Sequence, residues 1–108
     1  MNISVVIVAF KSDHLLKNII SSIPSHFEII VIENSLQNET KNDLEKNFSN
    51  VKVLIPNENL GYSGGINLGV ENSKYNFVLA LVADVVFSIE MLQNFEKCIE
   101  QFNDFALL

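Results

Sequence analysis

The sequence predicts a single α/β domain in which a mostly parallel sheet of four to five strands carries helices on both faces. Two observations support this prediction. Short, β-branched and almost wholly apolar runs recur along the chain, and segments with helical periodicity separate them. Strands buried on both faces of a parallel sheet have such runs, and a helix is the usual crossover between parallel strands. The 108 residues, 48% of them hydrophobic, suffice for one core.

The strands differ in how strongly they are predicted to be buried. Two of the runs, ISVVIVA and EIIVI, are nearly continuous apolar stretches, as expected inside a parallel sheet. The run VKVLI alternates around Lys52, which is typical of an edge strand. The strands that we expect are residues 3–9, 28–32, 51–55 and 76–82, with 105–108 as the start of a fifth.

The first two helices have recognisable boundaries. Ser12 or Asp13 can cap the first helix, and Pro24 stops it. The second opens near Thr40 in a loose relative of the capping box, and it should be largely solvated because Leu44 is one of few inner residues. The inner side of the first helix is expected to consist of Leu15, Leu16, Ile19, Ile20 and Ile23.

Two further helices are expected in the second half of the chain. The third covers residues 62–73, and the fourth runs from a cap at Ser88 to about Phe102. Cys98 falls in the helical pattern of the fourth helix, where a small buried hydrophobe is expected rather than a catalytic thiol. The inner face of the third helix is predicted to carry Tyr62, Ile66, Gly69 and Val70.

Composition excludes several classes of partner. Seven basic residues against thirteen acidic ones give a net charge of −6, which argues against a nucleic-acid partner because that binding depends on Lys and Arg. An acidic protein that binds a diphosphate needs a divalent metal, backbone N–H groups or both. No apolar run is long enough for a membrane span, and the start lacks a basic signal region. A single cysteine suits the reducing cytoplasm.

All four glycines fall between Gly61 and Gly69, after the third strand. Ligands of open parallel sheets bind beyond the carboxyl ends of the strands, and polar residues follow all four predicted strands, although loops facing water are polar in any case. The spacing fits neither a dinucleotide fingerprint after the first strand nor a Walker A loop. Gly61 suits a turn at positive φ, and Gly69 suits close helix–sheet packing. Gly64 and Gly65 suit either close approach of a ligand or a tight helix–sheet contact.

Four segments together resemble the amino-terminal half of family 2 glycosyltransferases. They are ISVVIVAFK at 3–11, EIIVIENS at 28–35, NLGYSGGINLG at 59–69 and the run 77–84 that ends in Asp84. The glycine segment matches the family's "NLGF-GG-N-G" pattern almost letter for letter, and the resemblance spans essentially the whole chain. It implies a Rossmann-like, three-layer α/β/α fold with strand order 3-2-1-4.

The resemblance also implies the activity and the nucleotide contacts. Such enzymes are transferases, here of the hexosyltransferase type, that move a sugar from a nucleotide-diphosphate donor to an acceptor. The base would meet Glu33, which stands where the family usually has Asp, so the reach of the carboxylate changes. The nucleotide contacts that the resemblance assigns are Phe10, Glu33, Asn34, Gly64, Gly65 and Asn67.

The family's acidic motif, D-x-D or a variant, holds a divalent metal on the diphosphate. Here the segment is Val82-Ala83-Asp84, so Asp84 would be the one protein ligand of Mg²⁺ or Mn²⁺, with the donor and water supplying the others. Asp84 as an ordinary carboxylate at a strand end is the alternative.

The second half of such enzymes carries the acceptor pocket and the catalytic base. No motif places a base after Asp84. We therefore expect residues 1–108 to form one truncated nucleotide-sugar-binding domain that is inactive alone. A non-enzymatic module that keeps the fold for assembly, as a homodimer, is the first alternative. A receiver-like signalling domain with Asp84 as phosphoacceptor is the second, but it needs acidic residues after the first strand, and Ala9-Phe10-Lys11 has none.

Overall fold

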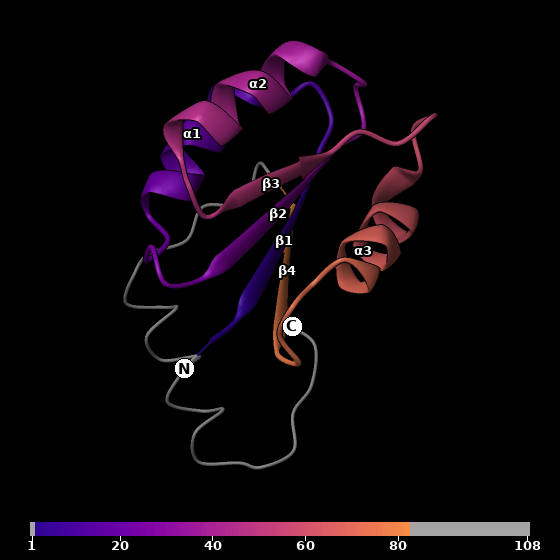
Figure 1. The fold of residues 1–108 in the computed structure, drawn as a ribbon. Coiled ribbons are helices and arrows are strands. Elements are labelled where there is room, and N and C mark those ends of the chain that lie inside the picture. Colours follow the sequence, from indigo (N-terminus) through magenta and orange to yellow (C-terminus); the bar gives the residue numbers. More distant parts are fainter. Residues whose placement is uncertain (1, 83–108) are drawn as a thin grey trace.

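The structure is a computed structural model that describes residues 2–82 of the chain (Figure 1). Within that range, strands and helices alternate without exception. The elements are β1 Ser4–Ala9, α1 Asp13–Ser21, β2 Glu28–Glu33, α2 Asn38–Asn47, β3 Val51–Leu54, α3 Gly61–Glu71 and β4 Val78–Val82. The helix expected at 88–102, the apolar run 105–108 and Asp84 lie outside the described residues.

The four strands form one parallel sheet in the order β3-β2-β1-β4, which confirms the predicted topology. β1 pairs with β2 from Ser4 opposite Glu28 to Ala9 opposite Glu33, and on its other side Val8 pairs with Val82. All strands therefore end at the same edge of the sheet, which we call the carboxyl edge. The strand order reverses at β1, so the end of β1 lies at the switch point where ligands of such folds bind.

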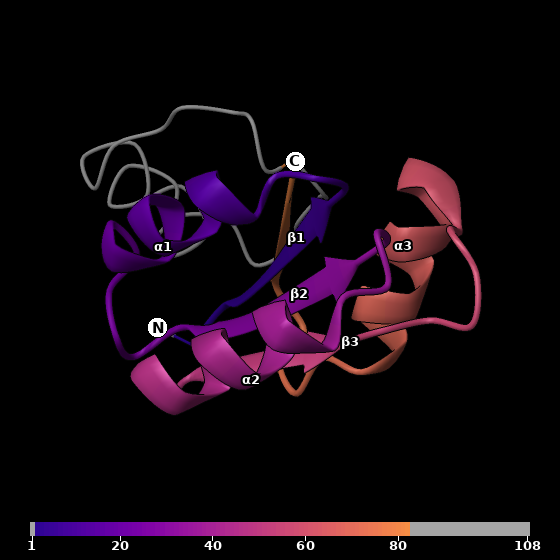
Figure 2. The same cartoon turned by 90° about the horizontal axis from the view of Figure 1, so that it is seen from above.

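Helices cover both faces of the sheet, as predicted. α1 and α2 lie on one face and α3 on the other (Figures 1 and 2). The side chains of β1 alternate between the two layers: Val5 and Ile7 pack in the core under α1 and α2, whereas Val6 and Val8 pack under α3. Burial on both faces explains why β1 reads as a continuous apolar run.

The second helix begins earlier than predicted. α2 starts at Asn38, and Thr40 is a buried residue inside it rather than its cap. The side chain of Gln37, the N-cap residue, makes no capping hydrogen bond. Instead the Gln37 N–H donates to the Glu33 carboxylate at 3.0 Å. A negative group near a helix N-terminus is favourable. The helix start is thus fixed from the end of β2, which a search for local caps cannot detect.

The predicted inner face of the third helix is partly wrong. Tyr62 is 49% exposed and Val70 is 39% exposed, while Gly65 and Gly69 are the buried residues of α3. The two glycines, four residues apart, share one side of the helix. Because they lack side chains, α3 lies close to the sheet, where Ile66 and Leu68 still pack against the core.

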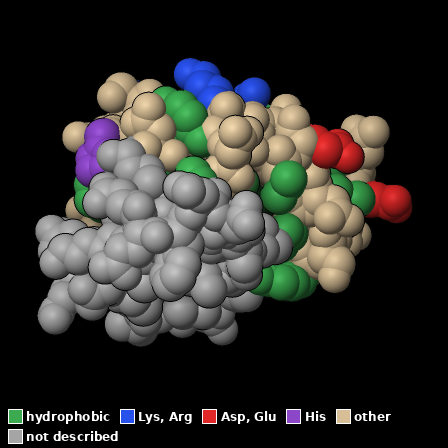
Figure 3. Space-filling model, turned by 90° about the horizontal axis from the view of Figure 1, so that it is seen from below, with side chains coloured by type: hydrophobic (Ala, Val, Ile, Leu, Met, Phe, Trp, Pro, Cys, Tyr) green, Lys and Arg blue, Asp and Glu red, His purple; other side chains and the backbone are tan. Residues whose placement is uncertain are grey.

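The surface carries no extended basic area on the face seen in Figure 3. Lysine and acidic side chains of the described residues lie there in separate, small groups. No helix within residues 2–82 combines the length and apolar character that a membrane crossing requires.

Candidate functional site

Glu33 ends β2 at the carboxyl edge and is fully buried, with 0% exposure. Its Oε1 accepts the backbone N–H of Ser35 at 3.1 Å and the Ser35 hydroxyl at 3.0 Å, and its Oε2 accepts the Gln37 N–H at 3.0 Å. A carboxylate that accepts several hydrogen bonds is well suited to burial. Glu33 therefore organises the loop between β2 and α2 in the conformation described.

Asn34, the next residue, joins three segments. Its backbone N–H donates to the Ala9 carbonyl at 2.8 Å, which continues the β1–β2 pairing. Its side-chain Nδ2 donates to the Gly61 carbonyl at 3.1 Å, and its Oδ1 accepts the Leu60 N–H at 3.2 Å. With 2% exposure, Asn34 is almost wholly shielded from water. The ends of β1 and β2 and the start of α3 are therefore held together.

Phe10 follows β1 and is 51% exposed, so its ring is available to a ligand. The Lys11 ammonium lies 5.2 Å from the centroid of that ring, within the range of a cation–π contact. The backbone N–H of Lys11 donates to the Ser35 hydroxyl at 2.6 Å. Ser35 in turn donates to Glu33, so one hydroxyl links the exits of β1 and β2.

Backbone strain gathers at the same two exits. Lys11 has φ 54° and Leu36 has φ 64°, and these are the non-glycine residues with positive φ in the described chain. Each such residue costs of the order of 1 kcal/mol, and such residues cluster where a site needs a fixed shape. Both loops are held by the Ser35 and Glu33 hydrogen bonds, so the strain is built into one connected structure.

The glycine segment begins α3 beside these loops. Gly61 has φ 70°, as predicted, and its N–H donates to Asn59 Oδ1 at 2.8 Å. A methyl group added at Gly65 would lie 3.0 Å and 3.1 Å from the two Val8 Cγ atoms, and one at Gly69 would overlap Val6. Close helix–sheet packing therefore accounts for Gly69, as predicted, and also accounts for Gly65. At Gly64 the added methyl would instead meet Leu60, within the same helix turn.

The predicted contact residues thus fall into two groups. Phe10 and Asn67 are exposed and Gly64 is half-buried, so these three can meet a ligand directly. Glu33, Asn34 and Gly65 lie beneath the surface and shape it. Four exposed apolar side chains border the same edge: Phe10, Leu36, Leu60 and Tyr62.

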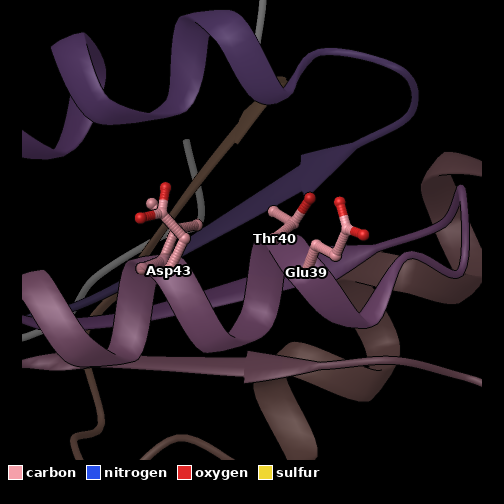
Figure 4. A pocket seen from close by; sticks show the side chains of 4 residues that line it. Glu39, Thr40 and Asp43 are labelled. Carbon is pink, nitrogen blue, oxygen red and sulfur yellow. The ribbon is translucent and has the colours of Figure 1, made fainter.

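Two of the hollows on the described surface lie beside α2 and α3. One, of about 320 Å³, is bordered by Glu39, Thr40 and Asp43 on the side of α2 that faces α1 (Figure 4). Asp43 there forms an ion pair with Lys17 of α1 at 2.9 Å. The other, of about 470 Å³, runs between β3 and α3 past Pro56. None of the six predicted nucleotide contacts borders either hollow. Within residues 2–82, no three His, Cys, Asp or Glu residues are grouped to hold a metal ion.

The comparisons with known proteins decide the family. A family profile described as glycosyl transferase family 2 matches residues 4–107. The chain belongs to glycosyl transferase family 2. Family membership agrees with the parallel sheet, its strand order and the glycine segment after β3.

A solved structure shares this fold. The chain is similar to S. aureus TarS 1–349, with a TM-score of 0.77 and 21% sequence identity. The alignment covers 95% of this chain and 33% of that chain, so this chain spans about a third of the TarS structure. At this identity the likeness shows the shared fold. A comparison with curated proteins finds no match.

Two residues at the carboxyl edge belong to the family motifs but had no predicted role, and the structure assigns a role to each. Ser35 links the exits of β1 and β2 through its hydroxyl. Asn59 accepts the N–H of Gly61 two residues on, which is an Asx turn. The Asn-x-Gly spacing was a readable signal for the second role, whereas the Ser35 bond to Lys11 spans 24 residues and has no local signature.

Proposed function

We propose that this chain is the donor domain of a family 2 glycosyltransferase and binds a nucleotide-diphosphate sugar at its carboxyl edge. The observation that carries the proposal is the convergence of the three family motifs at one place. The motifs after β1, β2 and β3 are far apart in sequence, and Asn34 and Ser35 bond them to one another. A rigid, partly apolar surface at the switch point of the sheet suits a nucleoside.

In this proposal the nucleotide lies against the exposed Phe10 ring, with Gly64 and Asn67 beside it. Stacking of a base on an aromatic ring is worth about 1–3 kcal/mol and needs no particular base. Glu33 is proposed to face the base from below, as the family role implies. Because Ser35 and Gln37 already occupy its oxygens, direct contact needs the Ser35–Gln37 loop to move. Without that movement, Glu33 acts by holding the loop, and Gly65 acts by bringing α3 close to the sheet.

Enzymes of family 2 generally use divalent metals, and we propose Mg²⁺ or Mn²⁺ at Asp84. When bound, such an ion neutralises charge on the leaving diphosphate. Val82 offers no ligand, and residues 2–82 contain no acidic cluster that could complete the site. In this proposal Asp84 therefore supplies the one protein carboxylate that binds the metal ion, and the diphosphate and water supply the remaining ligands.

We also propose that this chain binds the donor without completing the transfer. The support is the family organisation, in which a second half carries the acceptor pocket and the base that removes the acceptor proton. The chain spans 33% of the similar TarS structure. A hexosyl group as the transferred sugar is part of the same proposal.

The test is a thermal-shift panel of nucleotide-diphosphate sugars with uracil, guanine, thymine and adenine bases, each with and without Mn²⁺. At least one donor should raise the melting temperature, and Asp84→Asn should reduce the effect of Mn²⁺ while leaving the metal-free shift intact. If none of the donors stabilises the protein, the proposed function fails and the assembly alternative gains support.

Homodimerisation stays a prediction, and light scattering tests it. A monomer at high concentration would exclude the assembly alternative. Family membership leaves no support for the receiver-like alternative, and the exit of β1 contains no carboxylate between Ala9 and Ser12. A cytoplasmic location likewise stays a prediction from the single cysteine.

A further inference from the structure

The Asn34 side chain satisfies two backbone groups that require opposite partners. The Leu60 N–H needs an acceptor, and the Gly61 carbonyl receives a donor. A side-chain amide offers both at once, whereas a carboxylate offers only acceptors and an alanine offers neither. Leu60 is the N-cap residue of α3, and no side chain of the helix itself caps this end. Its N–H is one of the groups that a helix start leaves without an intrahelical partner.

We propose that Asn34 is a positioning residue of the nucleotide site. It fixes the start of α3, and with it Gly61 to Gly65, against the ends of β1 and β2 without touching the nucleotide. The family motif suggests a contact residue at this position, but both ends of the Asn34 amide are occupied and the residue is 2% exposed. The effect on binding rests on the proposed function, whereas the bridge itself is a property of the free protein.

The test compares Asn34→Ala and Asn34→Asp with the matched control Asn50→Ala. The Asn50 Nδ2 also donates to a distant backbone carbonyl, that of Phe27 at 3.0 Å, but at the opposite edge of the sheet. Amide hydrogen exchange at Leu60 reports the bridge, and exchange at Val31 in the central strand β2 reports global unfolding. Binding is followed with two probes, uridine diphosphate and guanosine diphosphate, each with Mn²⁺.

Asn34→Ala should speed Leu60 exchange about tenfold relative to Val31, the equivalent of about 1.4 kcal/mol. Asn34→Asp should keep Leu60 protected, because it retains the acceptor, but should weaken binding of the better probe because it loses the bond to Gly61. Asn50→Ala should change neither relative exchange nor binding. Unchanged Leu60 exchange in Asn34→Ala would overturn the bridge. Full-strength nucleotide binding by Asn34→Ala would overturn the positioning role. If the wild type binds neither probe, the donor proposal loses support, and the exchange result still decides the bridge.

A second, independent observation concerns the outer edge of β3. The Ile29 N–H donates to the Asn50 carbonyl at 3.0 Å, so the alternate residues Val51 and Val53 direct their backbone groups away from β2. Such outward groups at an exposed edge are a template for pairing with another chain.

Two residues of α2 and its C-cap residue, Phe48, bond to these outward groups. The Val51 N–H donates to the Phe48 carbonyl at 3.3 Å, the Val53 N–H donates to Glu45 Oε2 at 2.8 Å, and Lys41 Nζ donates to the Val53 carbonyl at 2.8 Å. Lys41 and Glu45 also form an ion pair at 2.9 Å. Positions 41 and 45 are four residues apart and therefore share one side of the helix, and Phe48 is its C-cap residue.

We infer that α2 takes the place of a further strand and closes the β3 edge to pairing with a second chain. The order of the ion pair supports this inference. Lys before Glu at this spacing is the less favourable arrangement for a helix alone. Both side chains instead bond the backbone of Val53 in β3, so the order of the pair suits the strand rather than the helix.

The test is the double variant Lys41→Ala/Glu45→Ala, with Lys17→Ala/Asp43→Ala as the control. The control removes an ion pair of the same length, 2.9 Å, that joins α1 to α2 without contacting a strand. In the Lys41→Ala/Glu45→Ala variant, amide hydrogen exchange at Val53 should be about tenfold faster than in the wild type. By light scattering, it should also show more self-association than the wild type, and the control should show neither change. The inference would be overturned if the Val53 amide of the double variant exchanged at the wild-type rate. It would also be overturned if the double variant associated no more than the wild type at NMR concentration.

Discussion

The packing of α3 on the sheet makes a quantitative prediction for Gly69→Ala. A methyl group at Gly69 would overlap one Val6 Cγ atom and lie 2.9 Å from the other and 3.2 Å from Val6 Cβ. Val6 Cβ is fixed to the central strand β1, so the overlap cannot be relieved by a rotamer change alone. Overpacking of this kind costs about 1–3 kcal/mol. Replacing Gly by Ala inside a helix returns about 1 kcal/mol. The free energy of unfolding should therefore fall, by up to about 2 kcal/mol.

Gly65→Ala should cost less, because its added methyl would lie 3.0 Å and 3.1 Å from the Val8 Cγ atoms. Urea denaturation of Gly69→Ala, Gly65→Ala and the exposed control Ser63→Ala gives the order directly. A loss of 1 kcal/mol corresponds to about 4–8 °C in melting temperature for a domain of about this size. If Gly69→Ala gained the full helix-propensity benefit instead, α3 would not pack on Val6 and the reasoning would be refuted.

Three further predictions concern single side chains. Phe10→Ala should change the unfolding free energy by no more than about 0.5 kcal/mol, because the ring is half exposed; calorimetric titration should nevertheless show about tenfold weaker nucleotide binding. Glu33→Gln should lower the free energy of unfolding by about 1.5–3 kcal/mol for each bond lost to Ser35 or Gln37, measured in urea; a stable variant would show that the carboxylate does not hold the loop. The third prediction concerns pH. Burial raises the pKa of Glu45, but the Val53 N–H and Lys41, with Lys52 nearby, outweigh it and hold the pKa below its usual value of 4.5. A lowered pKa stabilises the fold above the unfolded-state pKa, and this stabilisation disappears as the pH falls through the folded-state pKa. The stability difference between wild type and Glu45→Gln should therefore be constant near neutral pH and shrink below pH 4.5; a difference that stays constant in acid would contradict the cause assigned.

The fold was predictable because its signals are local. The β-branched runs at residues 3–9 and 28–32 are buried on both faces, and the alternation around Lys52 marks the edge strand β3. The two errors arose where a contact outside the helical pattern decides. The start of α2 depends on Glu33, outside the helix. The inner face of α3 depends on how closely Gly65 and Gly69 let it approach the sheet. A prediction from helical periodicity looks for apolar side chains. It therefore misses glycines, which face the sheet closely because they have no side chain.

The common location of the candidate residues was predictable, but their arrangement was not. Of the motif residues named from sequence, those within residues 2–82 lie around the carboxyl edge, because all parallel strands end there. Glu33 bonds residues two and four positions ahead, but no sequence pattern marked this turn of its side chain. Sequence could not show that Asn34 turns inward, since its side-chain partners lie 26 and 27 residues away and depend on the tertiary fold. The closure of the β3 edge by Lys41 and Glu45 was missed for the same reason. Their spacing reads as an ordinary surface ion pair, and only the backbone of Val53 reveals their second use.

The central claim is that a nucleotide binds at the carboxyl edge, and amide chemical-shift mapping tests it most directly. The protein is titrated with the nucleotide-diphosphate sugar that stabilises it most, and every backbone amide is followed. We expect the largest shifts at Phe10, Lys11 and Ser35 and along residues 61 to 67. Shifts confined to the hollow beside Glu39 and Asp43, or to the one between β3 and α3, would contradict it.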